Sequence, residues 1–422
     1  MNAAACDLLI VGAGPAGMAA ALAAAPSGAR ITLLDDNAAP GGQIWRDGPA
    51  AHLPPVAMAQ REALARHANV QLRCGTRVVG LGGRPGERAL LLEDAEDGWT
   101  QHYARLILCT GARELLLPFP GWTLPGVTGA GGLQALIKGG LPVAGQRIVV
   151  AGSGPLLLAA ARSARQAGAE VVRIAEQAGW AALAAFAARL PRWPAKAAQA
   201  MGLMQASYRA ASHLLAAQGD GRVQSVRLRE GRRECEIACE RLACGFGLIP
   251  NTELGQLLGG RLNARGGLVV DSYQATGVDG LYAAGECTGF GGSERALVEG
   301  AIAGHAAVGD GAAARALWPQ RARWQAFADT LHRHFALSPA LRQLAQPDTL
   351  VCRCEDVPHA ALAACGSWID AKLHTRCGMG PCQGRVCGAA AQFLFGWTPA
   401  PPRHLLSPAR IATLAAAVPV SR

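Results

Sequence analysis

Five cysteines in the last quarter of the chain have a spacing that suits a metal centre. Residues 352–354 read Cys-Arg-Cys, and residues 375–388 read TRCGMGPCQGRVCG. An iron–sulfur cluster needs four thiolates from tight turns, because soft sulfur ligands hold the iron. Four thiolates also suit structural zinc, which usually takes closer cysteine spacing, so zinc stays the competing interpretation. Five candidates compete for four places: Cys352, Cys354, Cys377, Cys382 and Cys387.

Three glycines and an acid near the start of the chain fit dinucleotide binding. The sequence GAGPAG occupies residues 12–17, and Asp35 follows it. Gly12 allows a tight turn, Gly14 lets the backbone approach a pyrophosphate, and Gly17 allows close packing of a helix. Amide groups and the dipole of that helix favour the phosphates, and Asp35 can hold ribose hydroxyls.

These residues need a particular order of elements, and the sequence supplies it. Residues 7–11 are a short apolar run that predicts a strand, residues 18–25 predict an alanine-rich helix, and residues 30–34 predict a second strand that ends at Asp35. A strand, a glycine turn, a helix, a strand and an acid are the elements of a dinucleotide-binding fold. This context makes the glycine motif far more specific than its letters alone.

A second glycine turn repeats this order with one change. Residues 146–151 predict a strand, Gly152 and Gly154 open the turn, and a strand over 171–175 ends at Glu176. Leu157 replaces the third glycine, where helix and strand approach closely. We therefore expect a mainly structural or regulatory nucleotide domain, with a working NAD(P)H site as the alternative.

Composition excludes several classes of protein. The 422 residues predict two to four domains, and half of them are hydrophobic. The net charge is +10, but the basic residues are spread along the chain, so we expect no nucleic acid partner. The start lacks the features of a signal peptide, and the apolar run 148–161 is shorter than a membrane span. We expect a cytoplasmic protein that reaches a membrane only through partners.

The remaining cysteines and the histidines give little chemistry. In a reducing compartment the 13 cysteines predict metal or redox chemistry rather than disulfides. Residues 235–244, with Cys235, Cys239 and Cys244, alternate like one strand with buried thiols. The histidines are scattered, so the catalytic residues stay unassigned.

Three further segments resemble the glutathione reductase-like flavoproteins, which have two dinucleotide-binding domains. They are Gly41-Gly42-Gln43, Cys109-Thr110-Gly111-Ala112, and the run 276–286 that ends in Gly285-Glu286. The resemblance implies FAD at the first site and a role for Glu286 near the flavin. Disulfide reductases of this group carry a cysteine pair that is missing here, which argues against that activity. The expected FAD-binding residues are Gly12, Gly14, Pro15, Ala16, Gly17, Asp35, Gly42, Gln43, Thr110, Gly111, Gly285 and Glu286.

The cysteine module resembles the bacterioferritin-associated-ferredoxin-like (BFD-like) [2Fe-2S] domain. Related sequences with GMGxCQGxxC share the cysteines that match Cys382 and Cys387. The resemblance therefore implies Cys352, Cys354, Cys382 and Cys387 as ligands, with Cys377 as the alternative. The order of motifs over nearly the whole chain resembles the α-type subunit of bacterial heteromeric amino- and imino-acid dehydrogenases, a group that includes D-hydroxyproline dehydrogenase, opine oxidase and hydrogen cyanide synthase.

This resemblance implies an FAD- and [2Fe-2S]-containing oxidoreductase subunit that transfers electrons. An amino-acid-oxidase-like flavin subunit would oxidise a small amino or imino acid such as D-hydroxyproline, an opine or glycine, and a small third subunit can complete the hetero-oligomer. The alternative is a self-contained NAD(P)H-dependent flavin and iron–sulfur oxidoreductase. An assembly subunit with vestigial sites is disfavoured by the intact FAD motifs.

The implied architecture is α/β, with two Rossmann-like domains, one inserted in the other, and a small α-rich BFD-like domain. We expect an FAD domain at 1–120 and 245–310, an inserted nucleotide domain at 121–244, a helical linker at 311–346, an iron–sulfur domain at 347–395 and a tail at 396–422.

Overall fold

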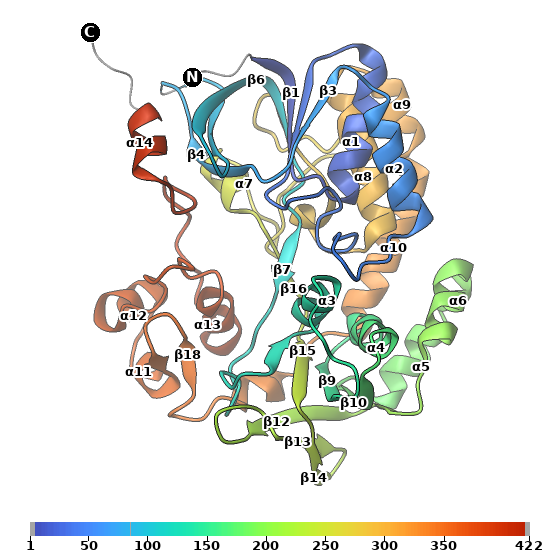
Figure 1. The fold of residues 1–422 in the computed structure, drawn as a ribbon, viewed down its shortest axis with the longest axis vertical. Coiled ribbons are helices and arrows are strands. Elements are labelled where there is room, and N and C mark those ends of the chain that lie inside the picture. Colours follow the sequence, from blue (N-terminus) through green and yellow to red (C-terminus); the bar gives the residue numbers. More distant parts are fainter. Residues whose placement is uncertain (1–4, 85, 418–422) are drawn as a thin grey trace.

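The first domain is built on a mostly parallel sheet of seven strands. A computed structural model describes residues 5–84 and 86–417 (Figure 1). The strand order is β3-β2-β1-β6-β5-β4, and β17 pairs with β6 on its other side. The strands are β1 Cys6–Val11, β2 Ile31–Leu34, β3 Val70–Arg73, β4 Arg77–Leu81, β5 Ala89–Glu93, β6 Gly98–Leu108 and β17 Leu281–Ala283. The central strand β1 is parallel to both β2 and β6, so the carboxyl ends of these strands open on one edge.

Two helices of this domain, α1 and α8, pack unusually closely. The helices of the domain are α1 Pro15–Ala24, α2 Pro55–Ala65 and α8 Ser293–Ala307. A Cβ on Gly300 would lie 2.0 Å from the carbonyl oxygen of Ala16, and one on Gly304 would lie 2.2 Å from that of Ala20. The backbones of the two helices are therefore in direct contact. This contact fixes the position of α1, which begins within the glycine motif at residues 12–17.

The second domain has a parallel sheet of five strands in the order β11-β10-β9-β15-β8. These strands are β8 Val127–Gly129, β9 Arg147–Gly152, β10 Glu170–Glu176, β11 Tyr208–Arg209 and β15 Arg241–Gly245. A separate antiparallel sheet contains β12 Ser212–Gln218, β13 Ser225–Glu230 and β14 Arg233–Ala238. The helices are α3 Ala130–Lys138, α4 Leu156–Gln166, α5 Trp180–Ala187 and α6 Pro194–Leu203.

One predicted strand is in fact two. Cys235 lies in β14 of the antiparallel sheet, whereas Cys244 lies in β15 of the parallel sheet, and Cys239 is in the turn between them. In that turn the amide of Cys239 donates to the carbonyl of Gln224, and the amide of Glu240 donates to that of Arg147. The alternating pattern continues through the turn, which is why the sequence did not reveal it.

The chain crosses between the two domains at a pair of short antiparallel strands. These are β7 Ala112–Glu114 and β16 Leu248–Pro250, and α7 Glu253–Leu257 follows the second crossing. The expected domain limits at 120/121 and 244/245 fall close to these strands. Short 3-10 helices complete the structure: η1 Ala25–Ser27, η2 Leu190–Arg192, η3 Gly285–Thr288 and η4 Pro339–Gln343.

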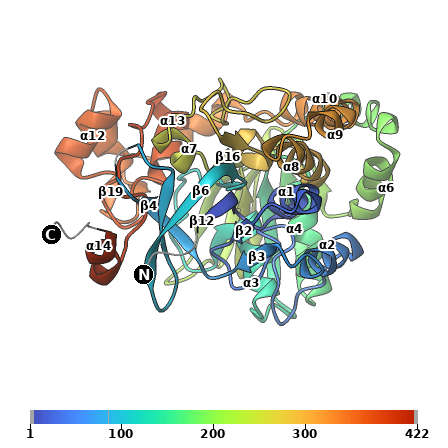
Figure 2. The same cartoon turned by 90° about the horizontal axis from the view of Figure 1, so that it is seen from above.

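The segment expected to be a linker is packed against both domains. It contains α9 Gly311–Ala316 and α10 Trp318–His334. The α10 helix contacts α8 of the first domain and α5 of the second. In Figures 1 and 2 it runs along one side of the molecule, with the cysteine module at the opposite side. The linker is therefore part of the rigid frame.

The cysteine module is a small unit with its own core. Its elements are β18 Leu350–Cys352, β19 Val357–Pro358, α11 His359–Ala363, α12 Trp368–Thr375 and α13 Cys387–Phe395. Trp368 and Leu362 are buried beside three of the cysteines. A Cβ on Gly378 would lie 2.6 Å from the Trp368 ring, so the glycine-rich turn lies directly against the indole.

The expected tail returns to the first domain. Leu406 donates its amide to the carbonyl of Val79 on β4, at 2.8 Å. The backbone amide of Arg410 and the hydroxyl of Thr413 both donate to the buried carboxylate of Glu93, and Thr413 belongs to α14 Ile411–Ala417. No helix within residues 5–84 and 86–417 is long and apolar enough to cross a bilayer.

The α1–α8 contact gives a stability prediction. We expect Gly304→Ala to lower the free energy of unfolding by about 1–3 kcal/mol, because the new methyl group meets the Ala20 carbonyl. Gly202→Ala in α6 is the control, since its methyl group would have no atom within 4 Å. Urea unfolding followed by circular dichroism measures both. Equal stability of the two variants would contradict the close contact.

Candidate functional site

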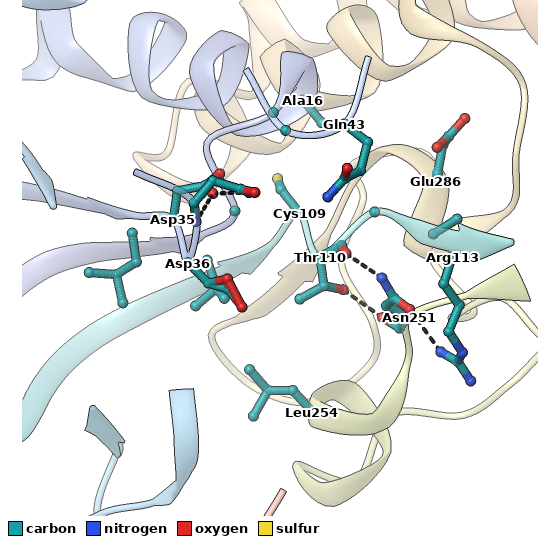
Figure 3. A pocket seen from close by; sticks show the side chains of 18 of the residues that line it. Ala16, Asp35, Asp36, Gln43, Cys109, Thr110, Arg113, Asn251, Leu254 and Glu286 are labelled. Atoms are coloured by element: carbon teal, nitrogen blue, oxygen red, sulfur yellow. Dashed lines mark hydrogen bonds between the residues drawn. The ribbon is translucent and has the colours of Figure 1, made fainter. Parts of the chain in front are cut away.

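The main cavity lies at the carboxyl ends of the first sheet. Its volume is about 670 Å³, and its walls come from both parts of the first domain, from the crossing strands and from the C-terminal region. In Figure 3, Asp35 and Glu286 lie on opposite sides of Cys109 and Thr110. This is where open α/β sheets bind their ligands.

The glycine motif leaves room for a phosphate. A Cβ on Gly12 would lie 2.2 Å from the carbonyl oxygen of Cys109, and one on Gly17 would lie 1.8 Å from that of Gly12. Both positions therefore require glycine for packing. A Cβ on Gly14 would instead enter the cavity, with its nearest neighbour, Gly42, at 3.8 Å. The open space over Gly14, at the start of α1, fits the pyrophosphate of FAD.

Asp35 is held at the end of β2 by its own loop. Its carboxylate accepts the amides of Ala13 at 2.7 Å and Asn37 at 2.9 Å, and also the side-chain amide of Asn37. The side chain is buried but lines the cavity. These bonds fix the carboxylate in a position that suits a ribose. The exposed Asp36 beside it also lines the cavity, and sequence reasoning did not single it out.

Glu286 is an acid of the cavity wall without a hydrogen-bond partner among the described residues. Burial raises its pKa, although Arg295 lowers it in part. An enclosed carboxyl without a partner fits a cavity whose ligand supplies hydroxyl donors.

A second acid, Glu299, positions Glu286 without lining the cavity. Its fully buried carboxylate accepts the amide of Gly285 and the hydroxyl of Thr288, both at 3.1 Å. It also pairs with Arg295 at 2.9 Å and with Arg321 of α10 at 3.4 Å. Glu299 therefore fixes the position of η3, and no local sequence motif predicts this role.

Most of the expected FAD-binding residues gather at this cavity. Gly17 and Gly285 pack behind the wall instead, against Gly12 and Ala16. Those that line it are Gly12, Gly14, Pro15, Ala16, Asp35, Gly42, Gln43, Thr110, Gly111 and Glu286. Wall residues that sequence reasoning missed include Thr76, Arg77, Arg113, Asn251, Glu253, Ser293, Arg385 and Leu406.

The loop that carries the cysteines also reaches this cavity. Arg385, between Cys382 and Cys387, lines the wall, and its guanidinium donates to the carbonyl of Leu406 at 2.6 Å. The carbonyl of Arg385 accepts from Arg113 at 3.2 Å. The cavity and the cysteine loop thus share a wall.

Arg113 ties this wall to the crossing strands. Its guanidinium donates to Asn251 at 2.7 Å and pairs with Glu253 at 2.9 Å. Asn251 in turn donates to the carbonyl of Thr110, as Figure 3 shows. One network therefore runs from the flavin-type motif at Thr110 to the cysteine loop.

The five candidate cysteines of the module lie together in two groups, and a sixth, Cys365, lies between α11 and α12. The sulfur atoms of Cys352, Cys377 and Cys387 lie within 4.8 Å of one another and are buried. The exposed Cys354 is hydrogen-bonded to Cys382. The two groups are neighbours. The charge of Cys352 contributes to the raised pKa of Cys354, and the charge of Cys382 contributes to the raised pKa of Cys387. Cys377, expected as the alternative ligand, is thus as central as the four preferred cysteines.

Backbone groups of the glycine-rich turn point at these sulfur atoms. Burial raises the pKa of Cys382, but hydrogen bonds from the backbone of Val386, from Cys354 and from the backbone of Gly384 outweigh it, and the net pKa is lowered. A lowered pKa favours the thiolate, which is the form that binds metal. The buried sulfur set is compatible with an iron–sulfur centre.

The second glycine turn is covered by the chain itself. The carbonyl of Phe335, just after α10, accepts the hydroxyl of Ser153 at 2.9 Å. A Cβ on Gly154 would lie 3.7 Å from the Phe335 side chain. Gln177 donates to the carbonyl of Ala336 and accepts the amide of Ser338, each at 2.8 Å. Residues 335–338 therefore lie over the turn where a dinucleotide would place its phosphates.

Leu157 and Glu176 are buried in the interior of the second domain. A Cβ on Gly245 would lie 2.7 Å from Leu157, so a glycine on β15 makes room for the leucine that replaces the third glycine. The fully buried Glu176 accepts the amides of Gly154 at 2.7 Å and Ala178 at 2.9 Å. Burial raises the pKa of Glu176 to about 7.

Residues 6–309 match the family model described as pyridine nucleotide-disulphide oxidoreductase. The chain belongs to this family. It is 32% identical over 427 residues to the hydrogen cyanide synthase subunit HcnB of Pseudomonas aeruginosa, covering 90% of each protein. It is 32% identical over 415 residues to an opine oxidase subunit of Rhizobium meliloti, again covering 90% of each. The crystal structure of L-proline dehydrogenase from P. horikoshii matches with a TM-score of 0.66 and 18% identity, over 98% of this chain and 80% of that one.

These matches confirm the resemblance that the motifs predicted. The chain is an FAD-dependent oxidoreductase, and its relatives are named as subunits of larger enzymes. The two-domain α/β fold with a helical C-terminal region is confirmed as well.

The contacts of Glu299 predict that its substitution lowers both the stability of the protein and its flavin content. We expect Glu299→Gln to cost about 3–5 kcal/mol of unfolding free energy, because it leaves Arg295 buried without its counter-charge. The ratio of flavin to protein after purification should also fall. Asp329→Asn is the control: it breaks the exposed pair with Arg265 and should cost at most about 1 kcal/mol. Similar losses in both variants would contradict the role of Glu299.

The raised pKa of Glu176 predicts that the stability of the protein depends on pH. The folded protein holds the Glu176 proton up to about pH 7, whereas the unfolded chain releases it near pH 4.5. Stability should therefore fall between these values, by on the order of 3 kcal/mol, and stay level above them. Glu176→Gln should lack this decline, although it gives up one acceptor. Urea midpoints of both proteins across this range measure the difference, and parallel curves would refute it.

Proposed function

We propose that this chain is the electron-transfer subunit of a heteromeric dehydrogenase. A partner flavin subunit would oxidise a small amino or imino acid, and this chain would carry the electrons through FAD and a [2Fe-2S] cluster. The observation that carries the proposal is the shared wall at Arg385. One residue, placed between two cysteines, lines the cavity that fits FAD.

The chain's own residues would hold the two groups. Gly14 leaves space for the pyrophosphate, Asp35 faces a ribose, and Glu286 offers a free carboxylate. Four of the five clustered cysteines would bind iron. When bound, FAD accepts electrons singly or in pairs, whereas the cluster carries one at a time, so together they connect two-electron and one-electron chemistry.

The fixed geometry of the wall serves such a transfer. Arg113 holds the Arg385 carbonyl, Asn251 and Glu253 together, with each contact at 3.2 Å or less. These contacts keep the cysteine loop against the cavity. Arg385 also places a positive charge at the wall, which favours a reduced, negatively charged group beside it.

The outer side of the cysteine module supports contact with a partner. Cys354 is exposed, and three apolar side chains of the same module are exposed as well. Ile369 and Leu373 lie on α12 with exposed fractions of 62% and 76%, and Met379 lies in the glycine-rich turn. Exposed apolar side chains on the same small module as an accessible cysteine suit docking of a second redox protein.

Two other activities are less compatible with these contacts. Residues 335–338 lie over the second glycine turn, which argues against a self-contained NAD(P)H-dependent reductase. Burial raises the pKa of Cys109 well above its usual value and that of Cys287 to about 11. Thiols that stay protonated are poor nucleophiles, which argues against thiol–disulfide exchange near the flavin.

The substrate assignment rests on the relatives. One is named as an opine oxidase subunit and another as a hydrogen cyanide synthase subunit. Both names fit oxidation of a small amino acid or an amino-acid conjugate. In this proposal the partner subunit selects among these substrates.

The proposal predicts what can reduce the isolated protein. Anaerobic addition of NADH or NADPH should leave the flavin and iron–sulfur absorption unbleached. Addition of the oxidase-like partner together with D-hydroxyproline or an opine should bleach both. Cys354→Ser should abolish or strongly slow bleaching of the flavin by the partner, whereas Cys235→Ser, in the separate antiparallel sheet, should not.

Two results would contradict this division of labour. Rapid bleaching by either nicotinamide nucleotide would favour the self-contained reductase and would mean that residues 335–338 move aside. Oxidation of the amino acid at full rate by this chain alone would remove the need for the partner.

A further inference from the structure

One face of the second domain is apolar although it is exposed. It is formed by α5, η2, α6 and the residues up to 206, and we name it the α5–α6 face. Three large side chains stand out on it, with exposed fractions of 65% for Trp180, 73% for Met201 and 59% for Met204. Most of the other exposed residues are alanine, proline or glycine: Ala181, Ala184, Ala187, Ala188, Pro191, Pro194, Ala195, Ala198, Gly202 and Ala206.

The face rests on a firm base. Phe186, Trp193 and Leu203 point inward and are buried. The Trp193 ring packs edge-on against Phe327 of α10 with centroids 5.2 Å apart, and Phe186 packs against Phe335 at 5.0 Å. The helices are therefore anchored through one side, and the apolar residues of the other side are held outward. In Figures 1 and 2, α6 lies at the edge of the molecule opposite the cysteine module.

The charge on this face has a single sign. Between Glu176 and Asp220 the sequence contains no acidic residue. Lys196 is neutralised by Glu294 at 2.7 Å. The arginines around the face form no ion pair with any described residue: Arg165, Arg189, Arg192, Arg209 and Arg323.

These arginines lie next to the apolar residues. Arg165 reaches the hydroxyl of Ser207 at 3.5 Å, just after α6. Arg323 donates to the carbonyl of Arg192 at 3.5 Å, between α5 and α6. The unpaired positive charges thus lie beside the connection between α5 and α6 and beside the end of the apolar strip after α6.

We propose that the α5–α6 face binds the surface of a bilayer that contains anionic lipids. An apolar strip with an exposed tryptophan, with unpaired arginines beside it and no acidic residue in its own sequence, is the pattern of segments that lie in the membrane interface. Each arginine near an anionic surface strengthens the attraction about fivefold. Trp180, Met201 and Met204 would enter the boundary between head groups and acyl chains.

A second copy of this chain is a poorer occupant. A two-fold symmetric contact brings the same patch of both copies together, so arginines would face arginines, and Glu294 beside the face is already paired with Lys196. A bilayer meets both properties of the face at once. This orientation also leaves the cysteine module, at the other edge of the molecule, pointing away from the membrane.

Vesicle flotation tests the proposal on the purified, flavin-loaded chain. The wild-type protein should float with vesicles of phosphatidylcholine and phosphatidylglycerol, much less with phosphatidylcholine alone, and less at high salt. Met201→Glu with Met204→Glu should reduce the floating fraction about tenfold or more, because both charges would enter the interface. Arg192→Gln should reduce it by several-fold. Ile411→Glu is the control, since Ile411 is 86% exposed on α14 of the C-terminal tail, away from the α5–α6 face, and it should float like the wild type.

The flavin spectrum and the circular dichroism of each variant report folding independently of vesicles. Failure of the wild type to float would overturn the proposal. Equal flotation of the double glutamate variant and the wild type would also overturn it, because binding would then come from another surface. Light scattering could instead show that the wild type forms oligomers that the double glutamate variant does not form. Without flotation, that result would overturn the proposal in favour of a protein contact.

Discussion

The buried carboxylate of Glu299 is the interaction on which the two halves of the molecule depend. It holds the amide of Gly285, and so the segment that presents Glu286 to the flavin cavity. It also pairs with Arg321 of α10. The same helix ends beside Phe335, which lies over the second glycine turn. One fully buried carboxylate thus connects the open dinucleotide site with the covered one. Buried charge of this kind is tolerated only when every partner is in place, so its geometry is well fixed.

The two glycine turns show how one fold serves two purposes. In the first turn, Gly14 faces open space, and Asp35 lies at the cavity wall. In the second, Gly154 faces Phe335, and Glu176 is enclosed by amides of its own chain. Both domains keep the strand, turn and helix, because these elements form the core. Only the surroundings of the turn decide whether a ligand can reach it.

Sequence predicted the parts of the site whose signals are local. The turn at residues 12–17 and the acid after β2 lie within one supersecondary unit, so their spacing carries the information. Arg113 and Arg385 carry no such signal, because the contacts that join them to each other and to Asn251 link distant parts of the chain. Glu299 has partners nearby in the sequence, but their spacing matches no recognised motif. Residues 235–244 misled the prediction, since their alternation continues through a turn between two sheets. Residues 406–408 had no pattern that would link them to a cavity built by the N-terminal residues.

Those last residues bear on the order of assembly. Leu406 and its neighbours are synthesised after all other residues that line the cavity, and after every cysteine of the module. On the ribosome, the glycine turn and both sheets can therefore form while one wall of the flavin cavity is still missing. During this period the cavity lacks the wall at Leu406, and pairing of Leu406 with Val79 then adds it. The cavity is therefore completed only at a late step of chain folding.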